Sequence, residues 1–152
     1  MLDVTERQPL LLTSAGGGSY WLCSDGSLVA RDAKLDRKGV FDRIARLPRI
    51  EDENGLADGQ LALAGTALQT AACCENVMPG NIARIVFATD GTISLYDRSN
   101  FEIKLGQPEK LEQKIGALPK ALRVCAKDKQ RMQCLDATNP RIFYQRWKEA
   151  VQ

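Results

Sequence analysis

The chain has 152 residues, of which 44% are hydrophobic and 26% charged, and its formal net charge is +2. This composition is typical of one compact globular domain and argues against a disordered chain or a coiled coil. The Lys and Arg residues are scattered rather than aligned on one face, which argues against nucleic acid as a partner. No apolar run reaches the roughly 18 residues of a membrane helix, and the first residues lack the pattern of a secretory signal.

The first third of the chain is predicted to form strands and one short helix. Strands are expected at 10–12 and 20–23, separated by a glycine-rich loop, and Asp25-Gly26 turns the second strand onto a third at 27–30. Apolar residues at helical spacing then predict a helix over 36–47, which Pro48 ends.

A polar loop and a second helix are expected next. Residues 51–59 include three consecutive acidic residues and two glycines, so they are predicted to form a solvated surface loop. Asp58 is the expected N-cap of the helix, and Pro79-Gly80 ends it. Its apolar face comprises Leu61, Ala64, Leu68 and Ala71.

A three-stranded meander followed by a helix is the clearest pattern in the sequence. Apolar and polar residues alternate over 82–88, 92–96 and 101–105, and Asp90-Gly91 forms the first turn. The next helix, over 108–118, is expected to begin at Pro108 and to be ended or kinked by Pro119, and its buried stripe comprises Leu111, Ile115 and Leu118.

The last strands are predicted at 123–126, 132–136 and 142–147. Helices and antiparallel hairpins in this order indicate an α+β fold. We expect a largely antiparallel sheet of hairpins and a meander, with two or three helices packed on it.

The five cysteines form no Cys-x-x-Cys pair, and the chain has no histidine, so no metal site is predicted. Cys125 and Cys134 flank a turn between two expected neighbouring strands, where a cross-strand disulfide is possible in an oxidising compartment. The alternative is that the cysteines are free thiols in the core. Adjacent Cys73 and Cys74 offer thiol redox chemistry, although the end of a helix disfavours a thiolate.

The sequence contains no catalytic constellation. Without histidine, Ser/His and Cys/His nucleophile pairs are excluded, and no glycine-rich phosphate loop with its lysine is present. We therefore predict a protein that is not an enzyme and that holds no cofactor and no small-molecule substrate.

Aromatic residues gather in the last predicted strand, which by its position is expected at a sheet edge. An edge strand with exposed aromatic side chains is suited to pairing with a partner strand. The alternative is that these side chains fold into the core of their own domain. The candidate partner-binding residues are Ile142, Phe143, Tyr144, Arg146 and Trp147.

These elements together resemble the extracytoplasmic β domain of the FtsQ/DivIB cell-division proteins. The segment that leaves the POTRA domain of that family resembles residues 4–12, and the following hairpin resembles Tyr20-Trp21-Leu22 with Asp25-Gly26. Further matching motifs are Leu47-Pro48 with Ile50, Asp90-Gly91, Leu105-Gly106, Leu111, Lys114-Ile115, Leu118 and Leu135-Asp136. The arginine often found after the last of these is replaced here by Ala137-Thr138.

The resemblance implies that residues 1–13 end a POTRA-type domain or its linking strand and that 14–152 form the β domain. It implies a single-pass membrane protein anchored by a helix outside this chain, with both domains on the extracytoplasmic face of the inner membrane at the division septum. Such a protein is a divisome scaffold that binds FtsB and FtsL and helps regulate septal peptidoglycan synthesis. The partner strand of that family adds to the last strand, here 142–147, whose neighbour is 132–136.

Two other functions remain open at this point. One is an extracytoplasmic thiol redox protein that uses Cys73 and Cys74. The other is a POTRA-associated component of an assembly or transport system.

Overall fold

A computed structural model describes residues 9–15, 18–23, 28–30, 48–53, 56–57, 60–61 and 64–149. Nine strands of these residues form one mixed sheet in the order β11-β10-β9-β8-β7-β4-β1-β2-β3. Its strands are β1 (Pro9–Ala15), β2 (Gly18–Cys23), β3 (Leu28–Ala30), β4 (Arg49–Asp52), β7 (Ile82–Phe87), β8 (Ile93–Asp97), β9 (Glu102–Gly106), β10 (Met132–Asp136) and β11 (Tyr144–Trp147). Short strands β5 (Leu56–Ala57) and β6 (Gln60–Leu61) pair with each other outside this sheet.

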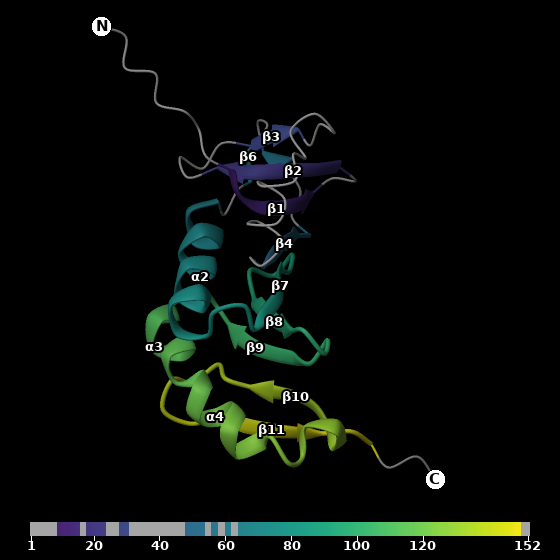
Figure 1. The fold of residues 1–152 in the computed structure, drawn as a ribbon, viewed down its shortest axis with the longest axis vertical. Coiled ribbons are helices and arrows are strands. Elements are labelled where there is room, and N and C mark those ends of the chain that lie inside the picture. The colour runs from purple at the N-terminus through teal and green to yellow at the C-terminus, as the bar shows by residue number, and fades with distance from the viewer. Residues whose placement is uncertain are drawn as a thin grey trace, which may run out of the picture.

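Helices α2 (Ala64–Val77), α3 (Leu111–Gly116) and α4 (Leu118–Cys125) lie along the same side of strands β7 to β11 (Figure 1). A 3-10 turn, η1 (Lys129–Arg131), links α4 to β10. Apolar residues of the helices and of the strands that face them form one buried cluster. The fold is therefore α+β with helices packed on the sheet, as the sequence predicts.

One row of apolar side chains crosses five strands beneath the helices. Ile50, Ile85, Leu95, Ile103 and Leu135 are paired in register from β4 to β10, and all five are fully buried. Side chains that pair directly across strands point to the same face, so this row defines the core side of the sheet. Burial of each such side chain stabilises the fold by about 1.5–3 kcal/mol.

The meander and the strand at 132–136 are confirmed as β7, β8, β9 and β10. Five of the eight pairings in the large sheet are antiparallel. The other three, β1 with β4, β4 with β7 and β9 with β10, are parallel.

The prediction of a loop over 51–59 is wrong at its start, because β4 lies in the middle of the sheet between β1 and β7. Ile50 and Asp52 are buried, and Glu51 pairs with Arg84 of β7 at 3.1 Å. The sequence does not indicate this strand, because Ile50 is its one apolar residue and the acidic residues that follow are typical of a loop.

The helix predicted over 108–118 is two helices. Lys110 precedes α3 in the left-handed conformation, with φ 54°, so Pro108 lies outside the helix that it was expected to begin. Pro119 lies in the first turn of α4, where its missing N–H costs no hydrogen bond. The helix therefore ends at Gly116, before Pro119, and the chain continues as a new helix.

The strand predicted over 123–126 is also wrong, because these residues form the last turn of α4 and its C-cap. Leu118, Ala121 and Cys125 are buried on one face of α4, at the three- and four-residue spacing of a helix. Leu61 lies in β6 rather than in α2. The expected helix at 36–47, the turn at 25–26 and the expected N-cap Asp58 lie outside the described residues.

Strand β1 pairs with both β2 and β4 and spans the expected domain boundary at residues 13 and 14. The division of the chain at that boundary stays a prediction. Among the described helices, the longest of which is α2 with 14 residues, none has the length and apolar character to cross a bilayer.

Gly106 ends β9 in a conformation that favours glycine, with φ 74°. A Cβ at this position would lie 2.9 Å from Cγ2 of Thr138, so alanine there would meet both backbone strain and a clash. We expect Gly106→Ala to lower the free energy of unfolding by about 2 kcal/mol or more, measured by urea denaturation. Gly65→Ala is the matched control, since nothing lies within 4 Å of its added methyl in α2. Equal stabilities of the two variants would contradict this account.

Candidate functional site

Strand β11 forms one end of the large sheet and pairs with β10 alone among the described strands. Its outer side therefore presents backbone N–H and C=O groups that no described strand binds. This confirms that the last strand lies at a sheet edge. The structure shortens it at its start to Tyr144–Trp147, so Ile142 and Phe143 lie in the connection that precedes it.

Among the residues whose side-chain exposure the structure describes, the exposed large apolar ones all lie between residues 124 and 147. They are Val124, Ile142, Tyr144 and Trp147, with exposed fractions of 59%, 51%, 50% and 50%. Phe143 packs against the core. The alternative that the aromatic residues fold inward thus holds for Phe143 and fails for Tyr144 and Trp147.

The two exposed aromatic side chains of β11 lie on opposite faces of the sheet. Gln145 pairs with Leu135 of the buried row and so faces the helices, and by alternation Trp147 faces the same way. Tyr144 and Arg146 face the side that no described helix covers. A strand added beside β11 would therefore meet an aromatic ring on each of its faces.

Side-chain and backbone contacts hold β11 in place. The amide of Gln145 donates to Sγ of Cys125 in α4 at 3.1 Å, and Arg146 pairs with Asp136 at 3.4 Å. Burial by itself would raise the pKa of Asp136, but hydrogen bonds from Thr138 and Arg146 outweigh it and hold this pKa below its ordinary value. After the strand, Lys148 donates from its backbone N–H to the carbonyl of Arg131 at 3.0 Å. The edge is thus a fixed part of the fold.

The open face of the sheet beside this edge is polar and largely paired within itself. Arg84 contacts Glu51, donates to Asn100 Oδ1 at 2.9 Å and lies 4.3 Å from the ring centroid of Tyr96. Tyr96 in turn donates to Glu102 at 3.0 Å. Because these charges already have partners, the open face is less suited to recognition than β11.

Charge is concentrated at the β11 end of the molecule. Residues 118–149 contain eight Lys and Arg against three Asp and Glu, whereas the rest of the chain contains thirteen against sixteen. Sequence reasoning treated the basic residues as scattered and missed this segregation, although charge counted by segment shows it. The strand at the sheet edge therefore lies in a positive region.

Cys125 and Cys134 are free thiols on opposite sides of the sheet. Cys125 belongs to the core cluster on α4, while Cys134 pairs with Glu102 and Arg146 on the open face. The expectation of a cross-strand disulfide assumed two neighbouring strands, and it loses this basis because Cys125 lies on a helix.

Cys73 and Cys74 also lack the surroundings of reactive thiols. Burial raises the pKa of Cys74 to about 12, and burial together with Glu112 raises the pKa of Cys73. Both thiols are thus protonated at neutral pH, which disfavours nucleophilic or redox chemistry. In the part of the chain that the structure describes, no three His, Cys, Asp or Glu side chains gather as a metal site would require.

Comparisons with known proteins give matches to solved structures alone. No protein-family model matches the chain, and no curated protein matches it. A solved structure, the major extracytoplasmic domain of the bacterial cell-division protein DivIB from Geobacillus stearothermophilus, is similar to it with a TM-score of 0.47 and 12% identity. The match covers 82% of this chain and 98% of that chain.

The burial of Cys74 predicts slow alkylation. A rise of its pKa from 9.0 to about 12 lowers the thiolate fraction at neutral pH about 1,000-fold. We expect iodoacetamide at pH 7 to modify Cys74 in the folded protein at least that much more slowly than in urea, as followed by peptide mass spectrometry. Similar rates in both conditions would restore the redox hypothesis.

Proposed function

We propose that this chain is a non-enzymatic scaffold domain of the bacterial division septum. It acts on the extracytoplasmic face of the inner membrane and belongs to a parent protein with a membrane helix and a POTRA domain. It binds FtsB- or FtsL-type division proteins by strand addition to β11 and so helps regulate septal peptidoglycan synthesis. The identity of the process and of the partners is supported by the ordered motifs that resemble the FtsQ/DivIB proteins.

The observation that carries the proposal is the state of β11. An edge strand that is exposed, fixed and aromatic on both faces offers main-chain hydrogen bonds for affinity and side-chain contacts for specificity. Tyr144 and Trp147 are each half exposed, which leaves apolar surface to bury in a complex. The partner-binding residues are Ile142, Phe143, Tyr144, Arg146 and Trp147.

The positive charge around β11 indicates what kind of partner strand we expect. The excess of Lys and Arg in residues 118–149 favours a partner with acidic residues near its pairing strand. Arg146 is the basic residue within β11 itself, and its side chain is 58% exposed despite its contact with Asp136. We expect the association rate to fall as salt is added, because steering between exposed charges is screened.

The central test is binding of a fluorescent FtsB-type periplasmic peptide to β11 variants. We expect Tyr144→Ala and Trp147→Ala each to weaken binding about tenfold or more, because each removes a large ring beside the added strand. Val124→Ala is the control: its side chain is 59% exposed on α4, so it reports general adhesion to apolar surface. The proposed binding site at β11 would be refuted if both aromatic variants bound the peptide as tightly as the unmodified chain, or if Val124→Ala lost as much affinity as they do.

A second measurement separates strand addition from side-chain docking. Methylating alternate backbone nitrogens of the same peptide removes donors that a new strand needs while keeping its side chains. We expect peptides methylated on the nitrogens that face β11 to lose binding, and those methylated on the opposite set to keep it. Equal affinity of both methylated sets and the unmodified peptide would exclude a paired strand.

A further inference from the structure

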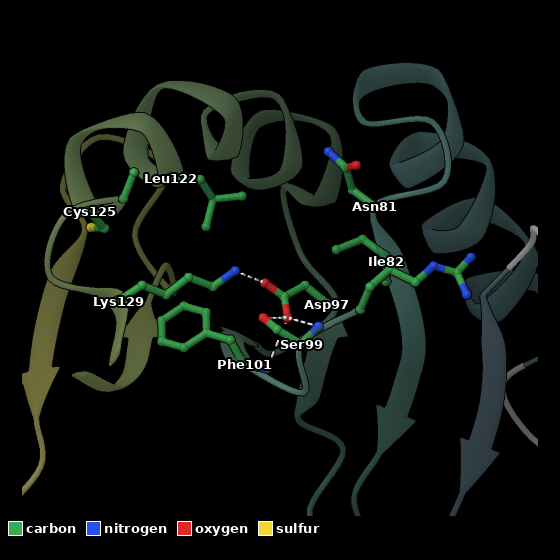
Figure 2. Close-up of a pocket in the computed structure, with 10 residues that line it drawn as sticks. Asn81, Ile82, Asp97, Ser99, Phe101, Leu122, Cys125 and Lys129 are labelled. Carbon is green, nitrogen blue, oxygen red and sulfur yellow. Dashed lines mark hydrogen bonds and ion pairs between the residues drawn. The ribbon is translucent and has the colours of Figure 1, made fainter. Parts of the chain in front are cut away.

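A cavity of about 420 Å³ opens between the end of α4 and the turn from β8 to β9. Figure 2 shows side chains of α4 and of η1 on one side of it and those of the sheet on the other. Its volume lies within the range of sites that bind small molecules. The proposed function does not use it.

The walls of the cavity are apolar. Ile82 from β7 and Cys125 from α4 are almost completely buried, Phe101 is 8% exposed, and Leu122 packs against the same core. These side chains offer contact to a hydrocarbon chain or an aromatic ring.

The rim carries a lysine held in a defined position. Lys129 reaches across to Oδ2 of Asp97 and lies 5.4 Å from the centroid of the Phe101 ring (Figure 2). A lysine ammonium has three N–H donors, and Asp97 takes one of them. The other two meet no acceptor among the residues that the structure describes.

Asp97 is a firm anchor for this lysine. Its Oδ1 accepts from the backbone N–H and the hydroxyl of Ser99 and from the N–H of Phe101, at 2.8–3.0 Å. Burial by itself would raise the pKa of Asp97, but hydrogen bonds from Lys129, Phe101 and Ser99 outweigh it and hold this pKa below its ordinary value. The carboxylate is therefore ionised at neutral pH, and its oxygens are already occupied.

The remaining polar groups of the rim add hydrogen-bond donors. Arg98, whose Nε donates to the carbonyl of Gly80 at 2.9 Å, is the second cation, and Asn81 contributes an exposed amide. The N–H donors that Lys129 keeps beside an apolar interior complement an anion with an apolar body.

We propose that this cavity binds a small amphipathic carboxylate. The apolar body occupies the space between Phe101 and Leu122, and the carboxylate accepts hydrogen bonds from Lys129 at the rim. This site is independent of strand addition at β11 and neither requires nor excludes it.

The proposal is tested by titrating the full chain with 3-phenylpropionate and, separately, with the uncharged 3-phenylpropanol, monitored by backbone amide NMR shifts. We expect the acid to bind at least tenfold more tightly than the alcohol and to shift amides within 97–101 and 122–129. Equal affinities, shifts confined to other residues, or no saturation at millimolar acid would each overturn the proposal.

Variants assign the two halves of the site. Lys129→Gln should abolish the preference for the acid, whereas Lys127→Gln, an exposed lysine outside the cavity, should keep it. Ala126 is an exposed residue of the cavity wall, and Ala126→Leu should weaken the binding of the acid and of the alcohol alike because the larger side chain fills part of the cavity. If both lysine variants lose the preference for the acid equally, the carboxylate is attracted by the overall positive charge of this region, and the proposed contact with Lys129 is wrong.

The source of the carboxylate is resolved by one further ligand, N-acetylphenylalanine, which presents the same groups as the last residue of a peptide. Affinity equal to that of 3-phenylpropionate assigns a peptide C-terminus as the natural occupant. Affinity at least tenfold weaker assigns a free carboxylate.

Discussion

The whole arrangement depends on the row of apolar side chains that runs from Ile50 to Leu135 beneath the helices. Because these five residues are in register and fully buried, they fix which face of every strand from β4 to β10 points inward. A shift of one residue in any strand would expose its core residues and bury its charges. The register of β11, and hence the faces on which Tyr144 and Trp147 lie, follows from this constraint.

The same constraint separates two kinds of surface. Opposite the buried row, charged side chains such as Arg84, Glu51 and Glu102 pair across neighbouring strands and leave a hydrated face. At the end of the sheet this cross-strand pairing stops, because β11 has a described neighbouring strand on one side only. Apolar exposure and positive charge accumulate there, which is the basis of the recognition that we propose at this edge.

Sequence patterns predicted the parts of the fold in which local chemistry and tertiary structure agree. The meander was readable because alternating residues and Asp90-Gly91 both indicate hairpins, and Gly91 has the positive φ that such a turn uses. Strand β4 was not readable, since its neighbours in the sheet are distant in sequence and its own residues are mostly charged. Residues 123–126 were misread because a β-branched Val124 beside Cys125 suits a strand, while the burial of Cys125 with Leu118 and Ala121 on one face of α4 is decided by tertiary contacts.

The candidate site shows the same division. The position of the last strand at an edge was predictable from its place at the end of a series of hairpins, and its aromatic residues marked it. Which ring would be exposed was not, since that depends on the register of β11 with β10 and on the bulge near Met132. The cavity beside Lys129 was also hidden, because its walls come from β7, from the turn between β8 and β9, and from α4, which meet only in the folded chain.

The hydrogen bond from Gln145 to the sulfur of Cys125 has a thermodynamic consequence for recognition. It ties the middle of the edge strand to a helix that is itself packed on the core, so the strand is already ordered before any partner arrives. The conformational entropy of ordering β11 is thus lost during folding, so in the strand addition that we propose only the incoming strand would lose freedom on association. In that proposal, a short partner segment needs few contacts to bind.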